Sequence, residues 1–218
     1  MVEKTNMGEN QIEVNGRAKE ILFRAMNILM KNLDENVEHL KKDKYFKFTQ
    51  KFIELVYDGI INKRKFFLLA SGRSAFILQC FATRLVHLGV DVYMVTNLAS
   101  IPAVSKEDIL IVLSGSGTTK IVVSLLENYV NNVKPFAIVS ITSHTESIIG
   151  RIADITIKLK GRTKRDRPDP QDDQAVLTTE GTQFEIAAFV YLDSIIAELA
   201  VRMGKTDADM LKKHSESI

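Results

Sequence analysis

Two glycines alternate with four hydroxyl side chains in the segment LSGSGTTK, residues 113–120, directly after an apolar run. Glycine lets a backbone turn sharply and approach a ligand, and hydroxyl groups donate hydrogen bonds to anionic oxygens. The segment also opens an expected helix, whose first N–H groups and positive dipole end attract anions. It therefore predicts a phosphate-binding turn, with an ordinary hydroxyl cap of the helix as the alternative. The residues of this turn are Ser114, Gly115, Ser116, Gly117, Thr118 and Thr119.

This turn matches neither of two common phosphate motifs. A P-loop requires G-x-x-x-x-G-K-[ST], which the chain lacks. A dinucleotide-binding fingerprint requires Gly or Ala three residues after Gly117, where Lys120 stands. The expected ligand is therefore a phosphate that is held by amides and hydroxyls, without a metal or a lysine clamp.

A second turn of the same kind lies in LASGRSAF, residues 69–76. Gly72 provides the turn, and Ser74 can cap the next helix or contact a ligand. Arg73 adds a planar fork of donors, for which a surface ion pair is an equally good interpretation. Two such turns after neighbouring strands could close on one sugar phosphate from both sides.

A carboxylate follows a third glycine turn in EGTQFEIAA, residues 180–188. Gly181 and Thr182 indicate the start of a helix. If Thr182 caps that helix, Glu185 can bond back to the helix end in a capping box. Alternatively, Glu185 is a general base that is directed at the same pocket, within hydrogen-bond reach of two adjacent carbons. The pattern alone leaves both interpretations open.

The elements that position these turns follow from the rhythm of apolar residues. Short continuous apolar runs indicate strands that are buried on both faces, as in parallel sheets, and helical patterns separate them. This alternation predicts a three-layer α/β/α sandwich with a five-stranded, mostly parallel sheet, which binds its ligand at the carboxyl ends of the strands. We expect strands at 66–70, 92–95, 109–113, 136–141 and 155–159, and helices at 74–88, 119–130 and, as a short turn, 146–150.

The 218 residues fit one domain, 1–218. Two amphipathic helices, 17–40 and 46–61, precede the first strand and are expected outside the sheet or against another subunit. A later helix, 184–203, is apolar around most of its circumference. It is either central in the fold or buried between subunits, and we favour the subunit contact because the helix follows the complete sheet. The expected parts are N-terminal helices in 1–62, the core sheet with its helices in 63–160, a charged loop in 161–180, and C-terminal helices in 181–218.

The composition excludes several classes of protein. With 29 basic and 27 acidic residues, the net charge of +2 does not suggest a nucleic-acid surface. The one dense basic run, RTKRDR at 162–167, is either a solvated loop or a set of anion contacts at the mouth of a site. No apolar stretch approaches the ~18–20 residues of a membrane span, and the N-terminus has no signal-peptide core. We expect a cytoplasmic protein without a membrane or nucleic-acid partner.

The cysteine and histidines predict no metal site. One cysteine, Cys80, excludes an internal disulfide, and its helical apolar surroundings predict that it is buried. No two of the four histidines have metal-ligand spacing. His144 follows the fourth strand and is a minor candidate for the pocket.

At these turns the chain resembles the sugar isomerase (SIS) domain family, whose fold is flavodoxin-like, and within it most resembles the 6-phospho-3-hexuloisomerases. The motifs that carry the resemblance occur in the family's order over roughly residues 20–218. They are Gly72-Arg73-Ser74, RLVHLG at 84–89, SGSGTT at 114–119, GTQFE at 181–185, and His214 near the C-terminus.

The resemblance implies a cytoplasmic homotetramer that interconverts 3-hexulose 6-phosphate and fructose 6-phosphate through a cis-enediol, without metal or cofactor. It implies that Ser114, Ser116 and Thr119 hold the phosphate and that Ser74 contacts the sugar. Glu185 would be the base. His214, from the same or a neighbouring subunit, would move the oxygen proton, and His87 matches a family position, with a helix-end cation favoured by the dipole as the alternative.

The chain departs from the family pattern where a sugar would be recognised. Ala70 and Ala75 replace expected glycines, Glu180 stands where a methionine is usual, and the loop at 96–102 lacks the usual glycine-and-acidic opening. The charged loop at 161–180 is unusual as well. Two alternatives therefore stay open: another sugar-phosphate aldose–ketose isomerase, of phosphoheptose or phosphoglucose/phosphomannose type, and a sugar-phosphate sensor without catalysis.

Overall fold

The computed structural model describes residues 3–95, 100–166 and 176–216. Its centre is a sheet of five parallel strands in the order β2-β1-β3-β4-β5. This confirms the predicted α/β fold class. Part of the 96–102 loop and of the charged 161–180 loop lies outside the described residues. The strands are β1 Phe66–Leu69, β2 Val92–Met94, β3 Ile109–Leu113, β4 Ala137–Thr142 and β5 Ile155–Lys158.

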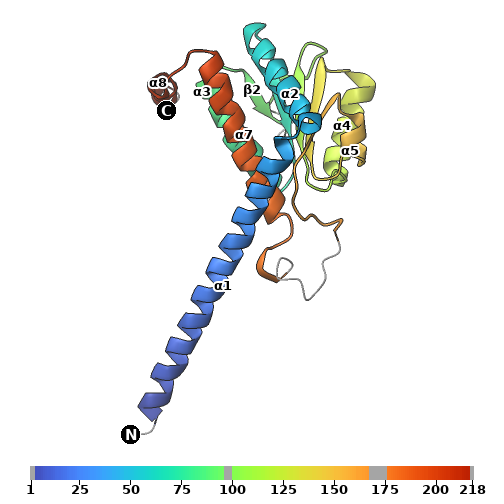
Figure 1. Ribbon diagram of the computed structural model, residues 1–218. Helices are drawn as coiled ribbons and strands as arrows, with labels where there is room; N and C mark the ends of the chain where they lie inside the picture. The colour runs from blue at the N-terminus through green and yellow to red at the C-terminus, as the bar shows by residue number, and fades with distance from the viewer. Residues whose placement is uncertain (1–2, 96–99, 167–175, 217–218) are drawn as a thin grey trace.

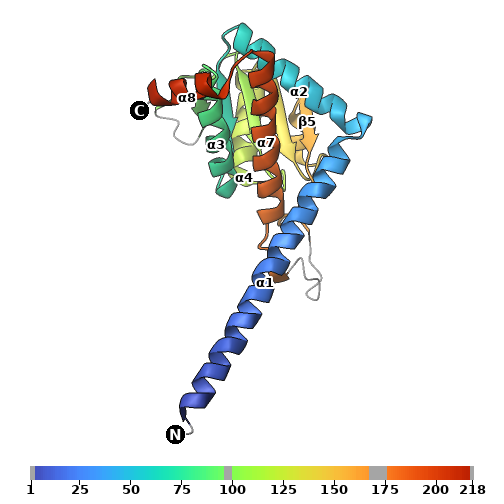
Figure 2. The same ribbon diagram turned by 60° about the vertical axis from the view of Figure 1, so that its left-hand side comes forward.

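Helices cover both faces of the sheet, which makes three layers (Figures 1 and 2). One layer contains α2, α3 and α7, and the other contains α4 and α5. Among the described residues, no helix combines the length and apolar character that crossing a membrane requires. The helices are α1 Glu3–Leu40, α2 Asp43–Ile61, α3 Arg73–His87, α4 Lys120–Asn132, α5 Ile148–Ile152, α7 Thr182–Arg202 and α8 Asp207–Glu216.

The apolar runs form strands because every other side chain finds a core on its own face of the sheet. Phe66 and Leu68 pack with α2, α3 and α7, whereas Phe67 and Leu69 pack on the side of α4 and α5. All five residues of β3 and all six of β4 are buried. Burying one such side chain contributes about 1.5–3 kcal/mol, so the two cores hold the strand ends in fixed positions.

Helix α7 packs into the core of its own chain, which was the other interpretation of its apolar circumference, and the favoured subunit contact stays a prediction for its exposed residues. Nine of its residues are buried, and it packs against α1, α2 and α3. Tyr191 shows how: its ring stacks near Phe52, and its hydroxyl donates to Thr49 Oγ1 over 3.2 Å, both in α2. All five strands precede α7 in the chain, but α2 and α3 leave part of one sheet face uncovered. Helix α7 covers that part, between α2 and α3.

Helix α1 begins at Glu3, well before the expected position 17, and its N-terminal half extends away from the body (Figures 1 and 2). Its C-terminal half is fixed by Asn36, whose side chain bonds both backbone groups of Lys160, as a neighbouring strand would. The Asn36 side chain donates to the Lys160 carbonyl over 2.9 Å and accepts from the Lys160 N–H over 2.7 Å. The chain that leaves β5 is therefore held in place before it reaches the charged loop.

Cys80 is exposed, contrary to the expectation that it is buried. Helix α3 faces the sheet with Leu78, Phe81 and Leu85, which are buried. At 100° per residue, Cys80 then points outward, because it lies beside that stripe and not within it. Phe76 on the same helix is also exposed.

Candidate active site

The carboxyl ends of β1 and β3 meet the start of α7 around a small polar hollow of about 180 Å³. β1 and β3 are neighbours in the sheet, so the turns that follow them lie side by side. Six of the twelve predicted site residues line this hollow, namely Ser74, Ser114, Gly115, Ser116, Thr119 and Glu185. The lining residues are Ser71, Ser74, Leu113, Ser114, Gly115, Ser116, Thr119, Thr163, Lys164, Glu180, Gly181, Phe184 and Glu185.

The hydroxyls of the β3 turn bond to one another instead of capping the helix. Ser114 Oγ lies 3.3 Å from Thr119 Oγ1, and the Thr118 hydroxyl donates to Ser116 Oγ over 3.3 Å. Thr119 is the N-cap of α4, yet its side chain makes no cap hydrogen bond. The capping alternative is therefore not what the structure adopts. These hydroxyls face each other at a helix N-terminus, which is the arrangement that an anion requires.

The β3 turn needs glycine at position 117. Gly117 has φ +62°, and a Cβ there would lie 1.9 Å from the Oγ of Ser147. Ser147 cannot move away cheaply, because its Oγ accepts the Gly150 N–H that caps α5. The end of β4 supports the same turn: Thr142 Oγ1 donates to the Gly115 carbonyl over 3.1 Å, and the Ser143 N–H donates to it over 3.0 Å.

Glu185 lies in the first turn of α7, but it forms no capping box. The helix begins at Thr182, and its N-cap is Gly181 at φ 85°, without a side-chain cap bond. The carboxylate of Glu185 turns instead toward α3, where Oε2 lies 2.6 Å from Arg73 Nη2. The same nitrogen donates to Thr182 Oγ1 over 3.1 Å. The Arg73 fork thus joins the turn after β1 to the start of α7.

Two opposing effects act on the Glu185 carboxyl. Burial raises its pKa above the ordinary value, because only 12% of the side chain is exposed, and the Arg73 guanidinium lowers it in part. Among the described residues, Oε2 accepts no well-directed hydrogen bond. The Oε2 atom is therefore buried and paired with Arg73 by charge, while the Glu185 carboxylate as a whole lines the hollow, where a general base would lie.

The loop that follows β5 contributes residues that the sequence did not single out, namely Thr163 and Lys164. The Gly181 N–H donates to the Arg162 carbonyl over 3.2 Å, so this loop is tied to the start of α7. Thr163 is buried, and its hydroxyl lies 3.0 Å from His144 Nε2. The basic run at 162–167 was the one signal for Lys164, through its alternative interpretation as anion contacts.

Ser71, Glu180 and Phe184 also line the hollow without having been predicted as contacts. Ser71 and Phe184 gave no signal, because a serine before a turn and an apolar residue in a helix occur everywhere in folded proteins, whereas Glu180 was noted as a departure where a sugar would be recognised. Gly72 and Thr118 flank the hollow: Gly72 is the N-cap of α3, and Thr118 bonds to Ser116. His144 stands behind Thr163, with Nδ1 3.4 Å from Glu146 and Nε2 3.4 Å from Asp166.

Two predicted site histidines lie elsewhere in the chain. His87 ends α3 and is buried, about 20 Å along the helix from Arg73. His214 belongs to α8, which packs on α3. Helix α8 follows the C-terminal end of α7, whereas Glu185 lies at the N-terminal end of α7 (Figure 2). The His214 side chain is outside the described ones. Within one chain, the hollow is therefore formed without either histidine.

The parallel sheet and the hydroxyl-rich hollow at its carboxyl edge define an α/β protein whose candidate ligand site lies where flavodoxin-like folds have theirs. Comparison with known proteins narrows the class, because the SIS domain model matches residues 59–166. A 3-hexulose-6-phosphate isomerase of Methanocaldococcus jannaschii is 33% identical over 165 residues, which cover 74% of this chain and 82% of that protein. A Bacillus subtilis protein of the same name is 29% identical over 161 residues, 72% and 82% of the two chains. The chain belongs to the SIS domain family.

Solved structures agree with this assignment. A crystal structure from Methanococcus jannaschii, from which a molecular function of 3-hexulose-6-phosphate isomerase was inferred, has 29% identity and a TM-score of 0.69. The match covers 87% of this chain and 96% of that one. A second crystal structure, of a hypothetical protein, has 28% identity and a TM-score of 0.73 over 88% and 96% of the two chains.

Proposed function

We propose that this protein is a sugar-phosphate isomerase that interconverts 3-hexulose 6-phosphate and fructose 6-phosphate through a cis-enediol, without a metal or cofactor. One observation carries the proposal: the Glu185 carboxylate lines the same hollow as Ser114, Ser116 and Thr119. An anion site and a candidate base at one strand edge are the two parts that moving a carbonyl along a phosphorylated sugar requires. The named relatives support the choice of substrate.

The phosphate is held first, at the turn after β3. The amides at the start of α4 and the hydroxyls of Ser114, Ser116 and Thr119 donate to its oxygens, with Lys164 at the rim for its charge. Ser74, from the turn after β1, contacts the sugar. Binding of this remote group fixes the reacting carbons, so part of the binding energy serves the chemical step.

Glu185 then moves the hydrogen. It removes the hydrogen on C3 of fructose 6-phosphate as a proton, and the C–H electron pair forms the C2=C3 double bond while the oxygen on C2 gains a proton. The hydroxyl on C3 then loses its proton, and Glu185 returns a proton to C2, which leaves the carbonyl at C3. A carboxylate whose pKa is raised by burial is a stronger base for this step than an exposed one.

Arg73 has a positioning role in this scheme. Without a neighbouring cation, a carboxylate that is 12% exposed is driven toward its neutral form. The Arg73 guanidinium at 2.6 Å favours the ionised form and sets the direction of Oε2. Because Arg73 is itself half exposed, it can also turn toward a sugar oxygen when the substrate enters.

The oxygen proton needs a second group. In a homotetramer, His214 of a neighbouring subunit is the candidate that the resemblance implies. His144 and Thr163 are the alternative within the chain, because their 3.0 Å contact leads to the hollow through Thr163. Substituting each histidine by Gln and measuring turnover distinguishes these choices, and the true proton carrier is the one whose loss lowers kcat most.

The proposal is tested by incubating the protein with a panel of phosphorylated ketoses and aldoses and following interconversion by NMR. We expect conversion between 3-hexulose 6-phosphate and fructose 6-phosphate. Conversion of a heptose or aldohexose phosphate alone would keep the isomerase and replace the substrate. Binding of phosphate esters without any conversion would indicate a sensor.

A further inference from the structure

The hollow at the strand edge contains more negative than positive side chains, although its proposed ligand is an anion. Glu180 and Glu185 both line it, and Lys164 is the one cation among the described lining residues. Arg73 lies close by, but its guanidinium is paired with Glu185 at 2.6 Å. Two carboxylates repel a phosphate dianion, and the repulsion is stronger in a partly buried site than in water. Phosphate affinity therefore depends on where Lys164 is held.

The loop that carries Lys164 is held by the end of β4. The Ser143 hydroxyl donates to the Gly161 carbonyl over 3.0 Å, and the Ser143 N–H donates to the Gly115 carbonyl over 3.0 Å. One residue thus ties this loop to the turn after β3. The methyl group of Thr163 lies against the same turn, since a Cβ added to Gly115 would be 3.2 Å from Thr163 Cγ2.

His144 fixes the next part of the loop through the Thr163 hydroxyl. Asp166 Oδ2 accepts the Thr163 N–H over 2.7 Å and the Thr163 hydroxyl over 3.0 Å. Burial raises the pKa of Asp166, but these bonds and the adjacent His144 lower it below the ordinary value, so the carboxylate is an acceptor at neutral pH. The hydroxyl has given its one hydrogen to Asp166, so His144 Nε2, 3.0 Å away, must donate to it.

This bonding leaves the Thr163 hydroxyl no capacity for a substrate. Its hydrogen goes to Asp166, and its two lone pairs accept from His144 Nε2 and from the Arg165 N–H, the latter over 3.3 Å. A proton relay from His144 to a sugar oxygen would have to break one of these bonds. The arrangement therefore favours a positioning role for His144 over proton transfer.

We propose that His144 and Asp166 are positioning residues that hold Lys164 beside the phosphate-binding turn, which makes the hollow selective for phosphorylated sugars. Lys164 follows Thr163 directly in the chain, so any displacement of Thr163 also moves Lys164. The inference rests on the proposed function, because it requires that the turn after β3 holds a phosphate. It adds the source of the positive charge and the contacts that place it.

The proposal is tested by calorimetric titration with inorganic phosphate, which needs no turnover, and by KM and kcat with fructose 6-phosphate. K164Q should weaken phosphate binding ~10-fold or more, because a charged donor is lost. K106Q removes the same charge just before β3, at the opposite edge of the sheet, and should bind as the wild type does. H144A should raise KM by a similar ~10-fold and change kcat less. H144Q should recover the affinity, because its amide still donates to Thr163.

The double variant H144A/K164Q shows whether His144 acts through Lys164. It should bind phosphate as weakly as K164Q alone, since effects along one chain of contacts do not add. Thermal unfolding checks that the variants stay folded, and K164Q, at an exposed side chain, carries the test if H144A does not fold.

Three results would each overturn the positioning role: additive losses in the double variant, wild-type phosphate affinity in K164Q, or a fall of kcat at unchanged KM in H144Q. A wild type that binds phosphate but isomerises no sugar phosphate would overturn the proposed function instead, and the phosphate affinities would still decide the role of His144. A wild type that binds no phosphate would overturn both.

Discussion

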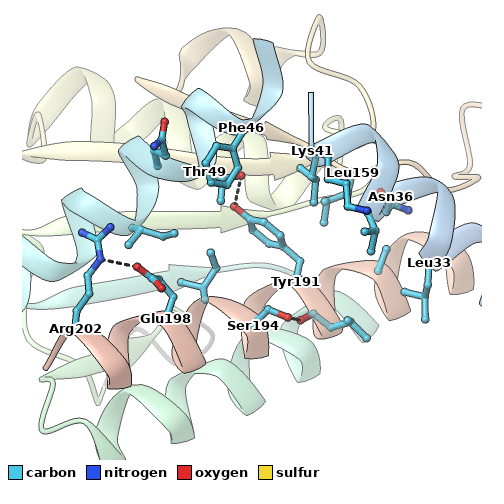
Figure 3. A pocket seen from close by; sticks show the side chains of 17 residues that line it. Leu33, Asn36, Lys41, Phe46, Thr49, Leu159, Tyr191, Ser194, Glu198 and Arg202 are labelled. Atoms are coloured by element: carbon cyan, nitrogen blue, oxygen red, sulfur yellow. Dashed lines mark hydrogen bonds and ion pairs between the residues drawn. The ribbon is translucent and has the colours of Figure 1, made fainter. Parts of the chain in front are cut away.

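Two of the hollows in the described part of the protein, a groove between α1, α2 and α7 (Figure 3) and the hollow at the strand edge, differ in both size and chemistry. The α1–α2–α7 groove is the larger, about 630 Å³, and its walls are mainly aliphatic and aromatic side chains on helix surfaces. The hollow at the strand edge is about 180 Å³ and gathers hydroxyls, a lysine and two glutamates from four segments of the chain. Volume by itself does not indicate reactivity, which depends on polar groups that a rigid sheet edge brings together.

The largest effect is expected from G117A, which changes the turn after β3 beside the small hollow and leaves the groove unaltered. An alanine Cβ would meet Ser147 Oγ at 1.9 Å in a backbone with positive φ, so the turn after β3 must rearrange. We expect loss of phosphate-ester binding by ~100-fold or more and a stability loss of ~2 kcal/mol or more. Calorimetric titration with fructose 6-phosphate and thermal unfolding measure both.

G204A is the matched control for that change. Gly204 has the same φ of +62°, but nothing lies within 4 Å of an added Cβ. It should cost only the ~1 kcal/mol of a left-handed non-glycine residue and leave ligand binding intact. Equal binding losses in G117A and G204A would mean that the clash with Ser147 does not matter.

R73Q should have a moderate effect, which appears in the pH profile. The guanidinium lowers the raised Glu185 pKa, so its removal raises that pKa further. A general base works when deprotonated, and activity is lost as the pH falls through its pKa. The acid limb of kcat/KM should therefore move to higher pH in R73Q, while activity at high pH changes less.

R84Q controls for the loss of an ion pair between the same two helices. Arg84 and Asp193 lie 3.5 Å apart on α3 and α7, both about half exposed. Its acid limb should coincide with that of the wild type. A profile that is unchanged in R73Q as well would remove Arg73 from its positioning role.

Y191F should produce a smaller effect, confined to the groove side. The hydroxyl of Tyr191 donates to Thr49 Oγ1, and such a bond contributes about 0.5–1.5 kcal/mol. We expect a stability loss in that range by denaturant unfolding, with turnover retained. A large drop in kcat without loss of stability would couple the groove to the site and contradict their separation.

Removal of metal ions should not change the rate of isomerisation. The proposed steps use a carboxylate, hydroxyls, amides, a histidine and the charges of Arg73 and Lys164, and no step requires a metal. Dialysis against EDTA should leave kcat unchanged. Activity that is lost on dialysis and restored by one divalent cation would contradict the metal-free mechanism.

The small hollow was the more predictable of the two. Its turns combine glycine with hydroxyl residues directly after apolar runs, so local chemistry and the parallel sheet together predicted that Ser114, Thr119 and Glu185 share one edge. Thr163 was missed, because it enters the site through the path of the 161–166 loop, which is tied to the start of α7. That path depends on tertiary contacts of Arg162, which leave no pattern in the sequence.

The groove side was harder to foresee. The sequence predicted two amphipathic N-terminal helices, but it could not show which face of α1 the body would cover. The answer depends on Asn36 binding the backbone of Lys160, 124 positions away. The same kind of ambiguity affected α7, since an all-round apolar helix fits a domain core as well as a subunit contact, and the structure shows the core packing.

The central claim is that Glu185 moves a hydrogen between adjacent carbons of a bound sugar phosphate. It is tested most directly by NMR in D₂O, with fructose 6-phosphate and the wild type, E185Q and E180Q, since both glutamates line the hollow. We expect deuterium at C3 of fructose 6-phosphate with the wild type and measurable exchange with E180Q. In E185Q, which should still bind the ester, exchange should fall by about 10²- to 10⁴-fold. Exchange at the wild-type rate in E185Q would contradict the account.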